Sequence, residues 1–404
     1  MFRKITLAGL ISVLVGAFAL AAAQGTAVHG PDHAAHDDHE EDELVGARLL
    51  IGEAGTPQLY VLDLDSGAVI AHFTVPGPSS IYQLPDTRYA LAVHRADNRV
   101  SVIHSGLSAV DHGDHADLLQ GNPYVLATLN VGRQPTHVYA RGSDLAFFND
   151  QDGTVAWLDA RLLGVSLDYV EIAAREPAHG AMAVLSGHMV VGLPDGGVDV
   201  YAPTGRSVAQ FSGCPGLHGQ APLGNTVTFG CTDGVLVVRS ASGGVFTAHK
   251  IANPPRSPEG ARVSTLTSDD DSAVLIGNFG QGIAVIDPVA LTITTHALPT
   301  NQIAGKLYEH GELYVHLGLD GNLRSIDPTT GEVLAELVVS GDASAQGSIR
   351  PTLAVFGSRA YVTDPVTFVV REIDLEHFEE ERHFHLTFMP SGVALMAIPG
   401  ASLH

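Results

Sequence analysis

Short segments in which apolar and polar residues alternate recur along most of the chain. From about residue 47 onward, a strand, a turn rich in Asp, Gly or Pro, and a second strand return every ~40 to 50 residues. Alternating apolar residues flanked by turn residues predict β-hairpins. The hairpins are expected at 60–75, 154–172, 198–211, 235–249, 283–298, 323–338 and 368–386, and an eighth copy with an insertion at 100–129.

A second pair of strands lies between successive hairpins, for example at 80–93, 137–148 and 264–277. Four antiparallel strands per repeat are typical of the blade of a β-propeller. A strand at 47–52 with its hairpin, and a lone apolar strand at 392–399, together predict one blade closed by both ends of the chain. We therefore expect an all-β, eight-bladed propeller over residues 47–404, with seven blades as the alternative.

The N-terminal 23 residues have the pattern of an export signal. Arg3 and Lys4 precede an uncharged apolar run at 5–20, and small residues follow up to Ala23, where we expect cleavage. An uncleaved membrane anchor is the alternative. No later stretch approaches the ~20 apolar residues that a membrane helix needs. The mature protein is therefore expected in the periplasm, with no membrane insertion.

Residues 24–46 form a low-complexity tract rich in His, Asp and Glu. Between His29 and Glu43 the chain contains no Lys or Arg. Such a segment cannot bury apolar surface, so we expect it to be flexible. Imidazole and carboxylate groups bind Zn²⁺, Ni²⁺ and Cu²⁺, which predicts metal binding, although a solvated acidic tail is the alternative. The candidate ligands in this tract are His29, His33, His36 and His39.

The charge of the chain narrows the class of its ligands. Asp and Glu number 44 against 21 Lys and Arg, which gives a formal net charge of −23. Phosphate backbones and anionic lipids are repelled by such a surface, so we expect no nucleic-acid partner. Histidines number 21, as many as Lys and Arg together, which favours metal cations as ligands.

Three histidines recur at one position of the repeat. His137, His179 and His218 stand at the starts of the innermost strands of successive blades. These starts surround one mouth of the central channel, so the three imidazoles are expected to converge there. Three imidazoles and one further donor suit four-coordinate Zn²⁺. We expect His94 as the fourth ligand, with Asp97, Asp364 or water as alternatives.

The insertion at 100–129 contains a second group of potential ligands. His112, Asp114 and His115 lie within a few residues of one another on a loop. They are a weaker candidate for a metal site, and a polar loop is the alternative interpretation. His383 and His385 alternate along one strand face, and we interpret them as a surface pair.

The chain has two cysteines, Cys214 and Cys231. Cys214 precedes the innermost strand of its blade, and Cys231 ends the strand that pairs back against it. Exported proteins meet an oxidising environment, so we expect a disulfide that restrains the segment carrying His218. A thiolate metal site is the alternative, and it requires reduced cysteines.

Motifs of common enzyme classes are absent from the sequence. It contains no GxSxG, P-loop or HExxH motif. We therefore expect no enzymatic activity and a monomeric binding protein. The alternatives are an exported metal-dependent propeller enzyme, with Glu176 as its base, and a propeller scaffold for protein interactions.

The signal sequence, the tract HGPDHAAHDDHEEDE, the eight-fold repeat and the single cysteine pair together resemble the AztD family of periplasmic zinc metallochaperones. The resemblance extends over essentially the whole chain. It implies a propeller that binds Zn²⁺ and passes it to AztC, the solute-binding protein of an ABC-type zinc importer. It also implies that the histidines of the flexible tract assist this transfer.

Overall fold

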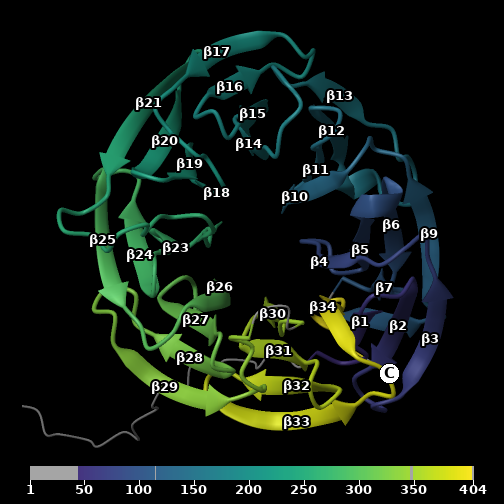
Figure 1. Cartoon of the computed structure of the whole chain (residues 1–404). Helices are drawn as coiled ribbons and strands as arrows, with labels where there is room; N and C mark the ends of the chain where they lie inside the picture. Colours follow the sequence, from purple (N-terminus) through teal and green to yellow (C-terminus); the bar gives the residue numbers. More distant parts are fainter. Residues whose placement is uncertain (1–43, 114, 346–348, 403–404) are drawn as a thin grey trace, which may run out of the picture. The chain divides into compact units, whose positions relative to one another are not determined.

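The computed structural model describes residues 44–113, 115–345 and 349–402, and almost all of their regular structure is β-strand. The strands form eight four-stranded antiparallel sheets around a central channel (Figure 1). The expected all-β propeller is therefore confirmed with eight blades, and the seven-bladed alternative is wrong. The signal sequence and the four histidines of the acidic tract lie outside the described residues.

Each blade begins with the strand next to the channel and ends with the strand on the outside of the ring (Figure 1). Blades one to four are β34 (Pro390–Met396), β1 (Arg48–Glu53), β2 (Gln58–Asp63), β3 (Val69–Thr74); β4 (Ser80–Gln83), β5 (Tyr89–His94), β6 (Arg99–His104), β9 (Tyr124–Leu129); β10 (Pro135–Arg141), β11 (Asp144–Asn149), β12 (Thr154–Asp159), β13 (Val170–Ala173); and β14 (Ala181–Leu185), β15 (His188–Gly192), β16 (Val198–Tyr201), β17 (Ser207–Phe211). Blades five to eight are β18 (Gln220–Leu223), β19 (Thr226–Cys231), β20 (Gly234–Ala241), β21 (Val245–Ala252); β22 (Leu266–Thr267), β23 (Leu275–Asn278), β24 (Gly282–Asp287), β25 (Thr292–Ala297); β26 (Gln302–Tyr308), β27 (Leu313–Gly318), β28 (Asn322–Ile326), β29 (Val333–Val338); and β30 (Leu353–Phe356), β31 (Arg359–Asp364), β32 (Val369–Asp374), β33 (Glu379–His385).

Blade one joins the two ends of the described chain. Strand β1 pairs antiparallel with β34, and Leu50 lies opposite Ala394. Both side chains are fully buried in a core cluster shared with blade two. The expected closure of one blade by an N-terminal and a C-terminal strand is confirmed, and it ties the ring together by backbone hydrogen bonds.

The apolar core lies between neighbouring blades. All six residues of β5 are buried, because blades cover both faces of a middle strand, whereas the outer β3 alternates between exposed and half-buried positions. Phe148, Met182 and Phe229 come from three successive blades and are fully buried in one cluster. Burying an aromatic side chain of this size contributes ~1.5–3 kcal/mol. This packing holds the channel ends of blades three to five in a fixed arrangement.

The insertion predicted at 100–129 forms its own small sheet. Strands β7 (Leu107–Asp111) and β8 (Ala116–Gln120) pair as a hairpin between β6 and β9, and β35 (Ala401–Ser402) runs parallel to β8. Two short 3-10 helices complete the described structure, η1 (Arg95–Asp97) and η2 (Ala160–Leu162).

One buried histidine has no hydrogen-bond partner within the described part of the chain. His316, on β27, is fully buried, and neither ring nitrogen is paired. Its burial lowers the pKa of the imidazole to about 4, and the nearby Arg324 guanidinium acts in the same direction. In an unfolded chain a histidine has a pKa near ~6.5. The folded protein therefore takes up this proton at a lower pH than the unfolded chain.

We expect the free energy of unfolding of the zinc-free protein to fall as the pH is lowered from ~6.5 to ~4, because the unfolded state binds more protons over this range. His316→Leu removes the buried imidazole and should flatten this dependence. Urea unfolding at several pH values measures it, with exposed His249→Gln as the control that keeps the wild-type slope. Equal slopes for wild type and His316→Leu contradict the prediction.

Candidate metal centre

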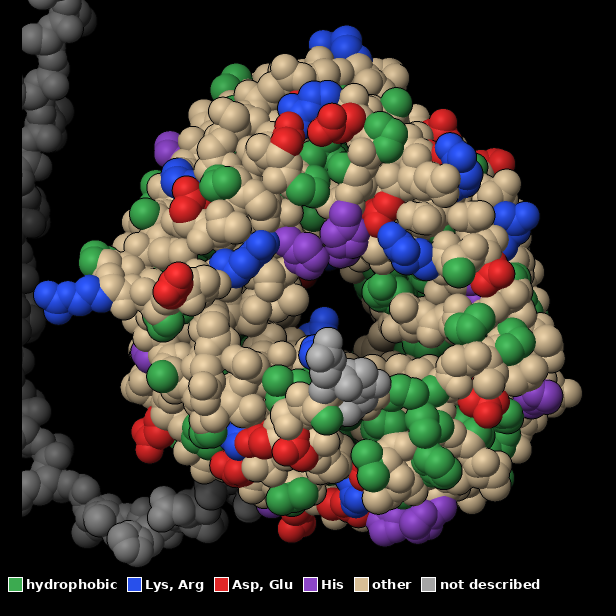
Figure 2. All heavy atoms as spheres, in the orientation of Figure 1, with side chains coloured by type: hydrophobic (Ala, Val, Ile, Leu, Met, Phe, Trp, Pro, Cys, Tyr) green, Lys and Arg blue, Asp and Glu red, His purple; other side chains and the backbone are tan. Residues whose placement is uncertain are grey.

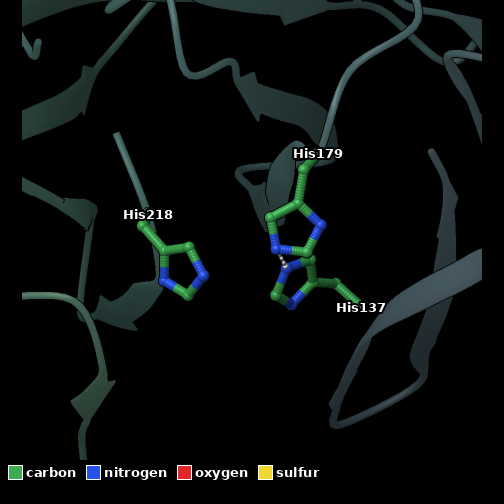
Figure 3. A group of neighbouring side chains, drawn as sticks. All are labelled: His137, His179 and His218. Atoms are coloured by element: carbon green, nitrogen blue, oxygen red, sulfur yellow. Dashed lines mark hydrogen bonds between the residues drawn. The ribbon is translucent and has the colours of Figure 1, made fainter. Parts of the chain in front are cut away.

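Three histidines from neighbouring blades meet at one mouth of the channel. His137 lies near the start of β10, and His179 and His218 lie two residues before β14 and β18. One ligand nitrogen from each lies within 4.8 Å of the other two. Figure 3 shows the three imidazole rings turned toward a common point. The structure thus brings together the three histidines that the repeat singled out.

The spacing of the rings fits a single metal ion. The Nε2 atoms of His137 and His179 are 3.1 Å apart, and the ring of His218 lies 5.3 Å from that of His179 between centroids. Zinc–nitrogen bonds of ~2.0–2.1 Å in a tetrahedron place two ligand nitrogens ~3.3 Å apart. Without metal, one Nε2–H donates to the other Nε2. A Zn²⁺ ion bound between them would take the place of that proton with little movement of these two rings.

Asp150 sets the orientation of His179. Its carboxylate follows β11, is almost fully buried, and accepts a hydrogen bond from His179 Nδ1 at 2.8 Å. A carboxylate behind an imidazole fixes the tautomer and strengthens the other nitrogen as a ligand. Nε2 of His179 is therefore left with its lone pair toward the cluster. The sequence pattern does not mark Asp150, because its partner lies in the next blade.

His218 is oriented in the same way by a backbone carbonyl. Its Nδ1 lies 2.7 Å from the carbonyl oxygen of Ser264, in the next blade, which leaves Nε2 for a metal. Gly219 follows with φ +74°, a conformation that favours glycine, and a Cβ there would collide with the same carbonyl. Only glycine lets the chain pass close enough for this hydrogen bond.

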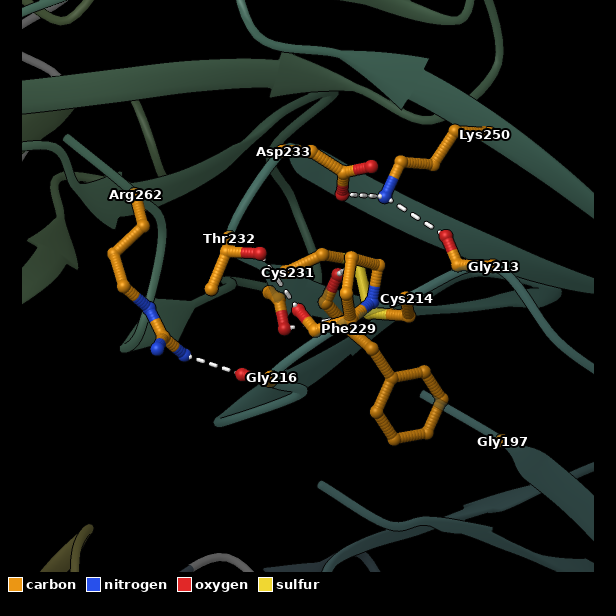
Figure 4. The surroundings of a disulfide bond; sticks show 12 residues. Gly197, Gly213, Cys214, Gly216, Phe229, Cys231, Thr232, Asp233, Lys250 and Arg262 are labelled. Atoms are coloured by element: carbon orange, nitrogen blue, oxygen red, sulfur yellow. Dashed lines mark hydrogen bonds and ion pairs between the residues drawn. A yellow bond between two sulfur atoms is a disulfide. The ribbon is translucent and has the colours of Figure 1, made fainter. Parts of the chain in front are cut away.

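The segment before His218 is held at several points. The structure contains the predicted disulfide between Cys214 and Cys231, both fully buried (Figure 4). The backbone N–H of Thr232 donates to Pro215, and Arg262 donates to the carbonyl of Gly216. These contacts restrain the loop, so the position of His218 depends on blade five rather than on the loop alone.

His137 is half-buried beside the other two histidines of the cluster. Burial lowers its pKa to about 4, and the neighbouring His179 and His218 add to this effect. A metal ligates only neutral imidazole. The His137 imidazole is therefore already neutral at neutral pH, and metal binding does not compete with a cationic form of this ring.

His94 does not join the three histidines, contrary to expectation. It is fully buried at the end of β5, its Nδ1 is 2.7 Å from the carbonyl oxygen of Gly77, and its Nε2 is 2.9 Å from the Ser101 hydroxyl. Both ring nitrogens are thus used inside blade two. The second-strand ends point into the blade, whereas the innermost-strand starts face the channel.

The other expected donors and the base of the enzyme alternative also lie outside the cluster. The Asp364 carboxylate accepts hydrogen bonds from the backbone and side chain of Thr367. Neither Asp97 nor Asp364 belongs to the described groups of converging ligands. Glu176 is exposed and does not belong to them either. Three histidines therefore leave a fourth coordination position to water or to an incoming ligand.

The weaker candidate on the insertion has a partner that the sequence pattern did not reveal. His112 and His115 both direct Nε2 toward the Asp117 carboxylate, at 3.1 Å and 3.4 Å, and their rings stack. Asp114 lies outside the described residues. Asp117 follows His115 by two residues, near the turn of the hairpin, and this spacing was the available signal. The site stays a prediction.

Two further groups of potential ligands lie on blade eight. Asp374, Glu376 and His377 bring ligand atoms within 4.8 Å of one another. The Asp374 carboxylate accepts backbone hydrogen bonds within its own turn, and its Oδ2 lies 3.6 Å from Nη1 of Arg359. The arginine therefore already balances its negative charge. His383 and His385 form the expected ring pair on β33.

The known proteins that are similar to this chain include a zinc chaperone. No protein-family model matches the chain. The zinc chaperone AztD of Citrobacter koseri is 26% identical over 375 residues, which cover 89% of this chain and 89% of that protein. The chain resembles AztD. A crystal structure of Citrobacter koseri AztD superposes with a TM-score of 0.79 at 25% identity, over 89% of this chain and 99% of that one.

The metal-free form of AztD matches equally well. The structure of apo AztD from Citrobacter koseri gives a TM-score of 0.78 and covers 88% of this chain and 99% of that one. By contrast, Sqt1 of Chaetomium thermophilum, at 16% identity and a TM-score of 0.59, covers 78% of this chain and 91% of that one and shares the fold alone. The likeness to AztD thus spans nearly the whole propeller of each protein.

Proposed function

We propose that this protein is a periplasmic zinc chaperone, which holds one Zn²⁺ ion at the channel mouth and delivers it to another protein. The observation that carries the proposal is the convergence of His137, His179 and His218 with Nδ1 of the latter two already engaged. The similarity to the zinc chaperone AztD over 89% of the chain supports the same role.

The three histidines suit a cargo site better than a sealed structural site. Structural zinc sites are closed by four protein ligands, whereas three protein ligands leave one position open. His179 is also exposed at the mouth, with 42% of its side chain accessible. A ligand from an acceptor reaches the ion at this open position, and the histidines then leave one at a time. The ion passes between proteins without release into solvent.

The acceptor we propose is the solute-binding protein of an ABC-type zinc importer, as the resemblance to AztD implies. The predicted signal sequence and the Cys214–Cys231 disulfide support a place in the periplasm, where such proteins work. No helix of the described residues is long and apolar enough to cross a membrane.

The test is a transfer assay. Zinc-loaded protein is mixed with the zinc-free acceptor, and the transfer rate is compared with the rate of zinc loss to a chelator in large excess. Transfer through a complex should exceed the chelator rate and rise with acceptor concentration. A transfer rate equal to spontaneous release contradicts a chaperone role.

We expect deletion of residues 24–43 to slow transfer while tight zinc binding is largely kept. The tract carries four histidines and seven acidic residues, which bind cations weakly and exchange them quickly, whereas the propeller histidines form the tight site. Chelator competition and the transfer assay on the mature and shortened proteins measure the two effects. If the shortened protein loses tight binding, the site assignment at the channel mouth is wrong.

A further inference from the structure

An arginine reaches into the hydrogen-bond network behind the histidine cluster. Arg95, on η1, donates from a terminal guanidinium nitrogen to Asp150 Oδ2 at 3.1 Å. His179 Nδ1 contacts the same oxygen at 2.8 Å. Asp150 Oδ1 is buried and has no hydrogen-bond partner among the described residues. One carboxylate oxygen therefore serves both the arginine and the candidate zinc ligand.

This sharing has a consequence for metal binding. A carboxylate behind a ligating imidazole strengthens the ligand, and its negative charge offsets part of the charge of the metal ion. The guanidinium of Arg95 neutralises that charge and takes part of the hydrogen-bonding capacity of Oδ2. With Arg95 in place, Asp150 supports His179 less than an unshared carboxylate does.

We propose that Arg95 lowers the affinity of the three-histidine site for Zn²⁺ and speeds its release, by neutralising the carboxylate that supports His179. The proposal rests on the proposed function and deepens it. A chaperone must give up its cargo, so maximal affinity works against transfer. Arg95 touches neither the metal position nor a ligand and acts through Asp150, which makes it a positioning residue.

Loss of Arg95 changes zinc affinity in opposite directions for a structural role and for a tuning role. Besides Asp150, it donates to Thr136 Oγ1 at 2.8 Å and to Gln134 Oε1 at 3.3 Å, in the segment that leads to His137. A merely structural role in holding this segment predicts weaker zinc binding when the arginine is lost. Tuning through Asp150 predicts tighter binding. Figure 2 shows Lys or Arg side chains on both sides of the histidines at the opening.

The first experiment measures zinc affinity and the zinc dissociation rate of Arg95→Met by chelator competition on the mature protein. The Arg95 side chain is half exposed, and such ion pairs carry modest energies, so we expect ~threefold to fivefold tighter binding and a matching fall in the dissociation rate. Arg95→Lys keeps the cation and should stay near wild type. Unchanged or weaker binding by Arg95→Met overturns the proposal.

A matched control tests whether the change in net charge alone alters zinc affinity. Arg133 pairs with Asp152, two residues from Asp150 in the same turn, and contacts none of the three histidines. Arg133→Met changes the net charge by the same amount and should leave zinc affinity unchanged. If both arginine variants tighten binding equally, the effect belongs to the overall field and the proposal fails.

Asp150→Asn tests the route of the effect. Loss of a partner behind a ligating histidine costs ~10- to 100-fold in metal affinity, so this variant should bind more weakly. In the Asp150→Asn background, Arg95→Met should have no further tightening effect, because the carboxylate through which it acts is gone. Tightening that persists in this background overturns the proposed route.

These outcomes separate the inference from the proposed function. If wild type binds no zinc tightly, or if binding survives replacement of His137 and His179, the cargo site itself is wrong. If the site holds and only Arg95→Met fails to tighten binding, the tuning role of Arg95 alone is refuted.

Discussion

The double variant His137→Ala/His179→Ala should lose tight zinc binding. The two Nε2 atoms lie 3.1 Å apart and form one edge of the candidate coordination site, so the variant removes two of three ligands. Losing a supporting partner behind a ligand already costs ~10- to 100-fold, and loss of two ligands should exceed the upper figure. Chelator competition and zinc stoichiometry on the mature protein measure the change.

The matched control is His112→Ala/His115→Ala on the insertion hairpin. It likewise removes two histidine side chains, here from the weaker candidate site, where both face Asp117. Tight binding near one equivalent should survive in this variant. If the channel-mouth variant instead keeps tight binding, the insertion or the acidic tract holds the cargo, and the three converging histidines have another role.

Sequence predicted the three-histidine cluster because a repeat converts sequence position into spatial position. His137, His179 and His218 stand at the same point of successive blades, and eight-fold ring geometry then places them side by side. His94 does not join this cluster. Its position at the end of a second strand lies inside the blade, where Gly77 and Ser101 engage both ring nitrogens.

The partners behind the ligands were not predictable from the repeat. Asp150, Arg95 and the carbonyl of Ser264 each contact a residue of a different blade, and no spacing in the sequence marks these pairs. Their contacts depend on the angle and distance between blades, which the apolar core sets. The fold and the cluster of three histidines thus followed from local pattern, whereas the contacts behind these histidines depend on the packing between blades.

The disulfide provides a second large expected effect. Replacing Cys214 and Cys231 together by Ala should lower the free energy of unfolding of the zinc-free protein by ~3 kcal/mol, because the bond closes a loop whose ends are 17 residues apart. Zinc affinity should fall as well, since the disulfide anchors the loop that ends at His218. Urea unfolding and chelator competition measure the two quantities on one preparation.

Comparison of the two quantities identifies what positions His218. The carbonyl of Ser264 and the backbone of blade five also hold this residue, through its Nδ1 and its N–H. If stability falls while zinc affinity stays at the wild-type value, these hydrogen bonds are sufficient and the disulfide has no role in the site. If both fall together, and saturating zinc restores part of the lost stability, the disulfide couples folding of blade five to the geometry of the metal centre.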